Sequence, residues 1–204
     1  LGADGGIMVT ASHNPPEYNG LKIAGSGAVP VASISGLFQI RDTLPAVLEQ
    51  ASKTGTLQTV SFIKEYLDLL VRESGFKNKN IKFVIDASNG MVPVVLKPLF
   101  EKLGLEPVLI NFDIDGSFPS HSPDISKKEN LEQLKNKILE TGADIGFAFD
   151  GDADRLTVLD EKGEKLPADF VVGLLFKAKS GLFRKPKVAH DLRFSRSIRE
   201  LFGK

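Results

Sequence analysis

The sequence has no cysteine and only 3 histidines among its 204 residues. Without cysteine there can be no disulfide framework and no thiolate metal site, and we expect a cytoplasmic protein. Lysine and arginine together number 26, as do aspartate and glutamate, so the formal net charge is zero. A neutral chain gives no support for a nucleic-acid partner or for binding to an anionic membrane surface. What remains is an ordinary globular protein of one large or two small domains.

Long hydrophobic runs are also absent. The longest are stretches such as Phe170 to Phe176, which are far too short to cross a bilayer. No basic segment followed by an apolar one stands at the start of the chain, so no leader peptide is recognised. We therefore expect no membrane partner. Residues 1–10 have the character of a domain interior instead, which predicts that the chain is a fragment of a longer protein.

The first part of the chain predicts a hairpin followed by a helix. An apolar stretch at 6–10 runs into a turn rich in proline, asparagine and glycine, and residues 21–24 are suited to a return strand. A helix is predicted over 33–48, with Ser33 as its cap and Pro45 as an interruption.

Polar, aperiodic residues at 53–59 mark a domain boundary, and beyond residue 60 strands and helices alternate. An acidic loop follows the strand predicted at 144–149, at its C-terminal end, where open α/β sheets place their ligand sites. The full set of predicted strands is 81–86, 107–111, 144–149, 156–159 and 187–191, and the predicted helices are 62–73, 92–103, 130–140 and 167–177.

The acidic loop carries three carboxylates at alternate positions, Asp150, Asp152 and Asp154, and Arg155 follows them. Two carboxylates about 5 Å apart repel by roughly 3 kcal/mol at an effective dielectric constant near 20. Three in one loop therefore need a compensating cation. Carboxylate oxygens suit a hard ion, and coordination positions left free for phosphate favour Mg²⁺.

Two other interpretations of this loop stay open. An EF-hand calcium loop has acids at the same positions, and Glu161 falls at its twelfth, but Arg155 stands where that loop needs glycine and strand-like segments flank it. A solvated acidic turn needs no ligand. The apolar strand before the loop and the arginine after it argue against a mere surface turn.

A second loop has the sequence Thr-Ala-Ser-His-Asn-Pro, in which Ser12 offers a hydroxyl nucleophile in a tight turn. His13 and Lys22 are the nearest groups able to hold a phosphate or carry a proton. The alternative is an Asn-Pro turn with an incidental serine. A serine hydrolase is not favoured, because the Gly-x-Ser-x-Gly elbow is absent. The other histidines, His121 and His190, are expected to be structural or exposed.

Taken in order along the chain, these loops resemble the α-D-phosphohexomutases, a family that includes phosphoglucomutase and phosphomannomutase. The resemblance covers most of the chain and implies an α/β fold with mixed-sheet βα domains, the first and third of them incomplete. It rests on residues 10–15, 19–22 and 150–155, and extends to 86–90, 115–119 and 121–124. The domains it implies are 1–55, the C-terminal part of domain 1; 56–182, domain 2; and 183–204, the start of domain 3.

The resemblance also implies an activity. Phosphorylated Ser12 would donate its phosphoryl group to a hexose monophosphate, giving a hexose 1,6-bisphosphate. That intermediate would turn within the site and return its other phosphate, so that 1-phosphate and 6-phosphate sugars interconvert. The residues implied are Ser12, Asp150, Asp152 and Asp154 for Mg²⁺, Ser12, His13 and Lys22 for catalysis, and Arg155 and Arg193 for substrate.

The chain departs from the family pattern in two ways. The third domain's sugar-recognition loop and the fourth domain's phosphate-binding loop are missing, and Ala153 stands where glycine is more frequent. Alanine there costs conformational energy if its φ must be positive. The segment 15–20 favours the glucose and mannose branch over phosphoglucosamine mutase. A metal-dependent phosphatase that uses Ser12, and a truncated, non-catalytic metal- or phosphate-binding fragment, also stay open.

Overall fold

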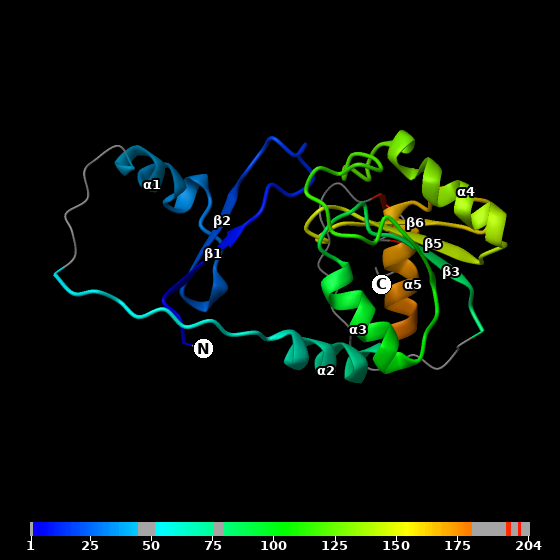
Figure 1. The fold of residues 1–204 in the computed structure, drawn as a ribbon, viewed down its shortest axis with the longest axis horizontal. Coiled ribbons are helices and arrows are strands. Elements are labelled where there is room, and N and C mark those ends of the chain that lie inside the picture. The colour runs from blue at the N-terminus through cyan, green and yellow to red at the C-terminus, as the bar shows by residue number, and fades with distance from the viewer. Residues whose placement is uncertain (1, 45–51, 76–79, 181–194, 197–199, 201–204) are drawn as a thin grey trace.

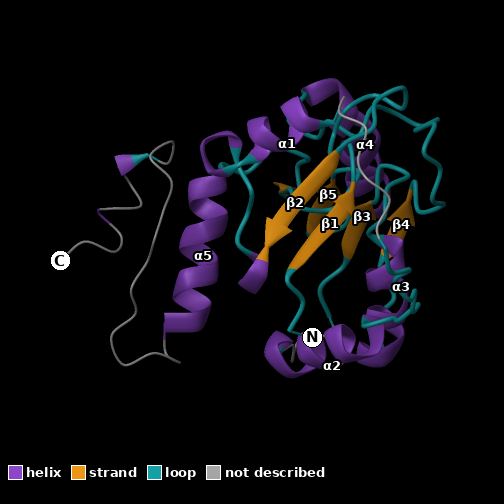
Figure 2. Ribbon diagram, turned by 90° about the vertical axis from the view of Figure 1, so that its left-hand side faces the viewer, coloured by secondary structure: helices purple, strands orange, loops and turns teal. Residues whose placement is uncertain are grey.

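The computed structural model describes residues 2–44, 52–75, 80–180, 195–196 and 200. They form two separate sheets with helices around them, as Figure 1 and Figure 2 show. None of the helices among these residues is both long and apolar enough to span a bilayer.

The smaller sheet is an antiparallel hairpin of β1 (Gly5–Val9) and β2 (Leu21–Gly25). Val9 pairs with Leu21 at its closed end, and the Thr10 N–H donates to the Gly20 carbonyl at 2.9 Å just beyond it. The connecting loop therefore starts and ends at one point and presents Ser12 at the tip of the hairpin. Both strands had been expected from the sequence.

The larger sheet has four strands in the order β4-β3-β5-β6. The two central strands, β3 and β5, are parallel, as are β3 and β4, whereas β6 runs antiparallel to β5. The predicted mixed α/β sheet is therefore confirmed. The strands are β3 (Phe83–Asp86), β4 (Val108–Ile110), β5 (Ile145–Phe149) and β6 (Leu156–Leu159).

Side chains alternate between the two faces of this sheet, and each face has its own core. On one face Val84 and Ala148 pack with Leu134 and Ile138 of α4 (Glu132–Thr141). On the other face Ile85 packs with residues of α3 (Pro93–Leu103), and α2 (Ile63–Ser74) lies against α3. The sheet is thus covered on both faces, as Figure 1 shows. The carboxyl ends of β3, β4 and β5 are left for loops that can carry a ligand site.

Helix boundaries agree with expectation except near the N-terminus. The predicted helix at 33–48 begins later: a 3-10 turn spans Ser33–Ser35, Gly36 has a φ of 127°, and α1 covers Leu37–Thr43. Ser33 is therefore not its cap, because the left-handed backbone at Gly36 interrupts the helical path before Leu37. Residue 48, Pro45 and the strand predicted at 187–191 lie outside the described residues. The last helix, α5, covers Ala168–Ser180.

Candidate active site

The two loops singled out from the sequence are in direct contact, although they are about 140 residues apart. The Thr10 hydroxyl donates to Asp152 Oδ2 at 2.8 Å. The Lys22 ammonium donates to Asp152 Oδ2 at 2.8 Å and to Asp154 Oδ2 at 2.9 Å. The backbones also touch, since a Cβ placed on Gly151 would lie 2.6 Å from the Ser12 carbonyl oxygen. The hairpin tip and the aspartate loop, residues 150–155, thus make one site.

Ser12 occupies a left-handed backbone conformation, with a φ of 59°. Its N–H donates to the Thr10 hydroxyl at 2.9 Å, which ties the turn to the residue that also binds Asp152. The Ser12 Oγ lies 3.3 Å from Nδ1 of His13. A half-buried hydroxyl with an imidazole beside it is suited to nucleophilic chemistry in which a proton is taken up or returned.

The aspartate loop is delivered by the end of β5 and returns into β6. Asp150 is fully buried, and one carboxylate oxygen from each of Asp150, Asp152 and Asp154 lies within 4.8 Å of the other two. Two buried oxygens, Asp150 Oδ2 and Asp152 Oδ1, accept no hydrogen bond from any described residue. Buried carboxylate oxygens left without a donor are costly. This oxygen-only donor set therefore fits a hard divalent cation such as Mg²⁺.

Burial and the neighbouring charges shift the pKa values of Asp150 and Asp152 in opposite directions. Burial, together with the negative charges of Asp154 and Asp152, raises the pKa of Asp150. Burial also acts to raise the pKa of Asp152, but hydrogen bonds from Lys22 and Thr10 outweigh it and the net pKa is lowered. The same hydrogen bonds to Asp152 and Asp154 raise the pKa of Lys22. Lys22 thus supplies positive charge to Asp152 and Asp154.

The remaining predicted residues are placed as follows. The Arg155 side chain is about half exposed, and its Nε lies 3.8 Å from Asp150 Oδ2 and 3.9 Å from Asp154 Oδ1. Ala153 has a φ of 61°, so the condition under which alanine costs more than glycine is met. Arg193 lies outside the described residues.

For two parts of this site the motif is evident in the sequence, but the contact that it makes is not. Thr10 belongs to the serine motif, but only the fold shows that its hydroxyl binds Asp152. The turn at 87–91 lies directly behind the aspartate loop, where the Met91 N–H donates to the Gly151 carbonyl at 2.9 Å. His121, expected to be structural or exposed, has only 7% of its side chain exposed and pairs with Asp86.

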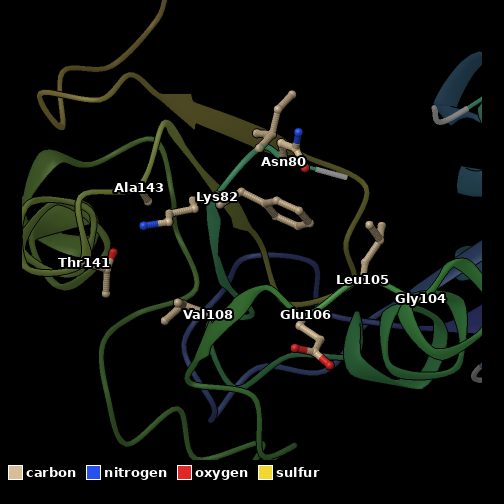
Figure 3. Close-up of a pocket in the computed structure, with 10 residues that line it drawn as sticks. Asn80, Lys82, Gly104, Leu105, Glu106, Val108, Thr141 and Ala143 are labelled. Carbon is tan, nitrogen blue, oxygen red and sulfur yellow. The ribbon is translucent and has the colours of Figure 1, made fainter. Parts of the chain in front are cut away.

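A separate cavity of about 560 Å³ lies at the opposite edge of the sheet. Figure 3 shows its lining, with Lys82 and Val108 at the points where β3 and β4 begin and Ala143 just before β5. Ligand sites of open α/β sheets lie at the carboxyl ends of the strands. Asp150 lies at that end, whereas this cavity lies at the amino ends of β3, β4 and β5. This cavity is therefore not part of the candidate active site.

Two parts of the chain match models of known protein families. Residues 60–163 match the family described as Phosphoglucomutase/phosphomannomutase, alpha/beta/alpha domain II, and residues 1–44 match the corresponding domain I. Phosphomannomutase of Escherichia coli is 38% identical over 96% of this chain and 45% of its own length. Phosphomannomutase/phosphoglucomutase of Pseudomonas putida is 37% identical over 98% of this chain and 42% of its own length.

A solved structure is similar over nearly the whole chain. The crystal structure of a phosphoglucomutase/phosphomannomutase family protein from Burkholderia thailandensis matches with a TM-score of 0.77 and 35% identity, covering 98% of this chain and 43% of that one. The chain thus spans less than half the length of the relatives it matches.

Proposed function

Because the chain belongs to the phosphoglucomutase/phosphomannomutase family, we propose that it supplies the phosphoserine and metal loops of a phosphosugar mutase. This enzyme interconverts the 1-phosphate and 6-phosphate of a hexose, glucose or mannose. The observation that carries the proposal is the contact between the hairpin tip and the aspartate loop, which sets a nucleophilic serine beside three converging carboxylates. Neither loop alone would favour this reaction over the alternatives.

Ser12 is the carrier of the phosphoryl group. A hydroxyl oxygen of the hexose monophosphate forms a new bond to phosphorus as the bond from Ser12 Oγ to phosphorus breaks. The hexose 1,6-bisphosphate then turns around, and its other phosphoryl group returns to Ser12 Oγ. Each transfer moves one proton between a sugar hydroxyl and a base in the loop. His13, whose Nδ1 is 3.3 Å from Ser12 Oγ, is placed to exchange it.

Asp150, Asp152 and Asp154 would hold Mg²⁺, with an oxygen of the phosphoserine as a further ligand. When bound, the ion neutralises charge on the phosphoryl group, which carries roughly −1.5 to −2 at neutral pH. Lys22 reaches two of these carboxylates, so its ammonium is close enough to share in balancing that charge. Arg155, half exposed at the edge of the loop, would contact the sugar phosphate.

The test is phosphoryl loading of the chain itself. Incubation with glucose 1,6-bisphosphate and Mg²⁺ should add one phosphoryl group, detected by intact mass and located to Ser12 by fragmentation. The Ser12→Ala variant should stay unmodified, and Asp152→Asn should load far more slowly. A phosphoryl group on another residue, or loading that is equal in Ser12→Ala, would contradict the assignment.

The products distinguish the mutase from the two alternative functions. A mutase half-site leaves a hexose monophosphate as the only other product of loading, because the phosphoryl group stays on the protein. A metal-dependent phosphatase would release free phosphate continuously. A non-catalytic metal-binding fragment would bind the ion without any change in mass.

A further inference from the structure

Behind the aspartate loop lies a buried pair that the proposed reaction does not use. Asp86, the last residue of β3, is fully buried, and its Oδ2 lies 3.0 Å from Nε2 of His121. Its other oxygen, Oδ1, accepts hydrogen bonds from the Ser88 N–H at 2.9 Å and from Asn111 Nδ2 at 3.0 Å. Asp86 thus joins three segments: its own turn, the end of β4 and the 113–124 loop.

The turn that Asp86 begins is held in an unfavourable backbone conformation. Ser88 and Asn89 have φ values of 48° and 54°, in the left-handed region that residues with a Cβ adopt at a conformational cost. The Asn89 N–H donates to the Asn111 carbonyl, and its carbonyl accepts from the Asp115 N–H. Such a turn keeps its shape only because the surrounding contacts determine it.

This turn grips the aspartate loop on both sides of Asp150. The Ser88 hydroxyl donates to the Phe149 carbonyl at 2.7 Å, and the Met91 N–H donates to the Gly151 carbonyl at 2.9 Å. The packing is tight, since a Cβ on Gly90 would lie 2.6 Å from the Gly151 carbonyl oxygen. The two residues that flank Asp150 are therefore fixed by one turn.

Asp150 depends on this backbone for its orientation. Its Oδ1 accepts a single hydrogen bond, from the Arg155 N–H at 3.1 Å, and its Oδ2 accepts none from the described residues. Arg155 Nε lies 3.8 Å from Oδ2, beyond hydrogen-bond distance, and its side chain is half exposed. We therefore infer that the peptide units on either side of Asp150 do most to orient its carboxylate. A small rotation of those units would move the oxygen away from its partners in Asp152 and Asp154.

We propose that Asp86 and His121 are positioning residues for the cation site, acting through the 87–91 turn to hold Asp150 in its binding orientation. This inference rests on the proposed metal-binding role of the aspartate loop. His121 does not touch the aspartate loop in this proposal and acts on it through Asp86. Its imidazole holds Asp86 Oδ2, and Asp86 Oδ1 accepts the hydrogen bond from the Ser88 N–H. The Ser88 hydroxyl then stays directed at the Phe149 carbonyl.

The test measures the affinity of the whole chain for Mn²⁺, used as a probe for the hard cation, by isothermal titration calorimetry. His121→Ala should weaken Mn²⁺ binding about tenfold or more while the circular dichroism spectrum stays that of a folded protein. His121→Gln should bind within about threefold of wild type, because the glutamine amide can donate to Asp86 in place of Nε2. Ile138→Val, which removes one buried methyl group from the core between α4 and the sheet, should lower the melting temperature without changing the affinity.

Ser88→Ala tests the same path without touching the buried pair. It should weaken Mn²⁺ binding several-fold, and it decides the matter if His121→Ala does not fold. Equal dissociation constants for wild type, His121→Ala and Ser88→Ala would overturn the positioning role alone. A wild-type chain that binds Mn²⁺ no better than Asp150→Asn would overturn the proposed metal site and this inference with it.

Discussion

The Lys22 ammonium group forms ion pairs with Asp152 and Asp154, two of the three carboxylates that we propose as cation ligands. Two unit positive charges about 4 Å apart repel each other by about 1 kcal/mol in water and by about 4 kcal/mol at a dielectric constant near 20. Because the Lys22 side chain is 48% exposed, the lower figure applies. Lys22→Met should therefore tighten Mn²⁺ binding by about five- to tenfold, as measured by calorimetry.

The matched control for this variant is Lys102→Met. Lys102 forms an exposed ion pair with Asp68 on α2, away from the aspartate loop, so its loss changes the net charge equally but not the local field. Mn²⁺ affinity should then be unchanged within about twofold. If the two variants gave the same affinity, Lys22 would not compete with the cation for its carboxylates.

His121 predicts a specific dependence of stability on pH. Burial acts to lower its pKa, but the hydrogen bond and charge of Asp86 outweigh burial and the net pKa is raised above about 6.5. Between the unfolded-state and folded-state pKa values, the folded protein therefore holds a proton that the unfolded chain has released. The stabilisation is full below about pH 6.5 and is lost as the pH rises through the folded-state pKa.

Urea unfolding at a series of pH values from about 6 upward measures this slope. The free energy of unfolding of the wild type should fall with rising pH more steeply than that of His121→Gln, which has no titrating group at that position. His13→Gln is the control, because it keeps the Asp86 pair. Parallel curves for wild type and His121→Gln would contradict the protonated pair.

The β1–β2 hairpin is an element with little core of its own. All residues of β1 are exposed, and so are the first two of β2. Its described attachment to the larger sheet includes the polar contacts of Thr10 and Lys22 and the packing of Ser12 against Gly151. Attachment through so few contacts makes the hairpin sensitive to the loss of any one of them.

Thr10→Val removes a hydroxyl that both donates to Asp152 and accepts from the Ser12 N–H, with almost no change in shape. Losing hydrogen bonds of this kind costs about 1–3 kcal/mol. Hydrogen exchange of the β1 and β2 amides should accelerate about tenfold or more, while amides of β3 and β5 stay protected. Thr43→Val, which removes an exposed hydroxyl of α1 that donates to the Gln39 and Ile40 carbonyls, should leave the β1 and β2 rates unchanged.

The sequence predicted the elements and both chemical loops because each is a local pattern. Val84 and Ile85 alternate between faces as a strand requires, and three aspartates within five residues need no fold to be noticed. The predicted start of α1 was wrong because Ser33 is a residue type that often caps helices. The backbone conformation of Gly36 instead decides where the helix begins.

Contacts distant in sequence could not be predicted in the same way. Nothing local tells that the Thr10 hydroxyl reaches Asp152, 142 positions later. The same holds for Asp86 and His121, which are brought together only when the 113–124 loop crosses the end of β3. The left-handed pair at Ser88 and Asn89 is partly readable, since asparagine tolerates that conformation, but serine gives no such signal.

At the scale of the whole molecule, the candidate site is the junction between two sheets with separate packing. The carboxylates come from the larger sheet and the nucleophile from the hairpin. A cation bound by the folded site and not by the unfolded chain shifts the folding equilibrium by RT ln(1 + [L]/Kd), about 2.7 kcal/mol when the free ion is at 100 times Kd. Bound Mg²⁺ should therefore stabilise the part of the chain that carries Asp150 against thermal unfolding.

We expect such Mg²⁺ concentrations to raise the melting temperature by roughly 5–10 °C and EDTA to reverse the rise. Asp150→Asn should abolish the shift, because it removes the charge of the buried ligand at the centre of the site. Glu161→Gln, an exposed acid beyond β6 at the position an EF-hand would use, should keep the shift in full. Should Glu161→Gln lose it while Asp150→Asn keeps it, the ion would be bound outside the three aspartates, and the hairpin serine would have no metal beside it.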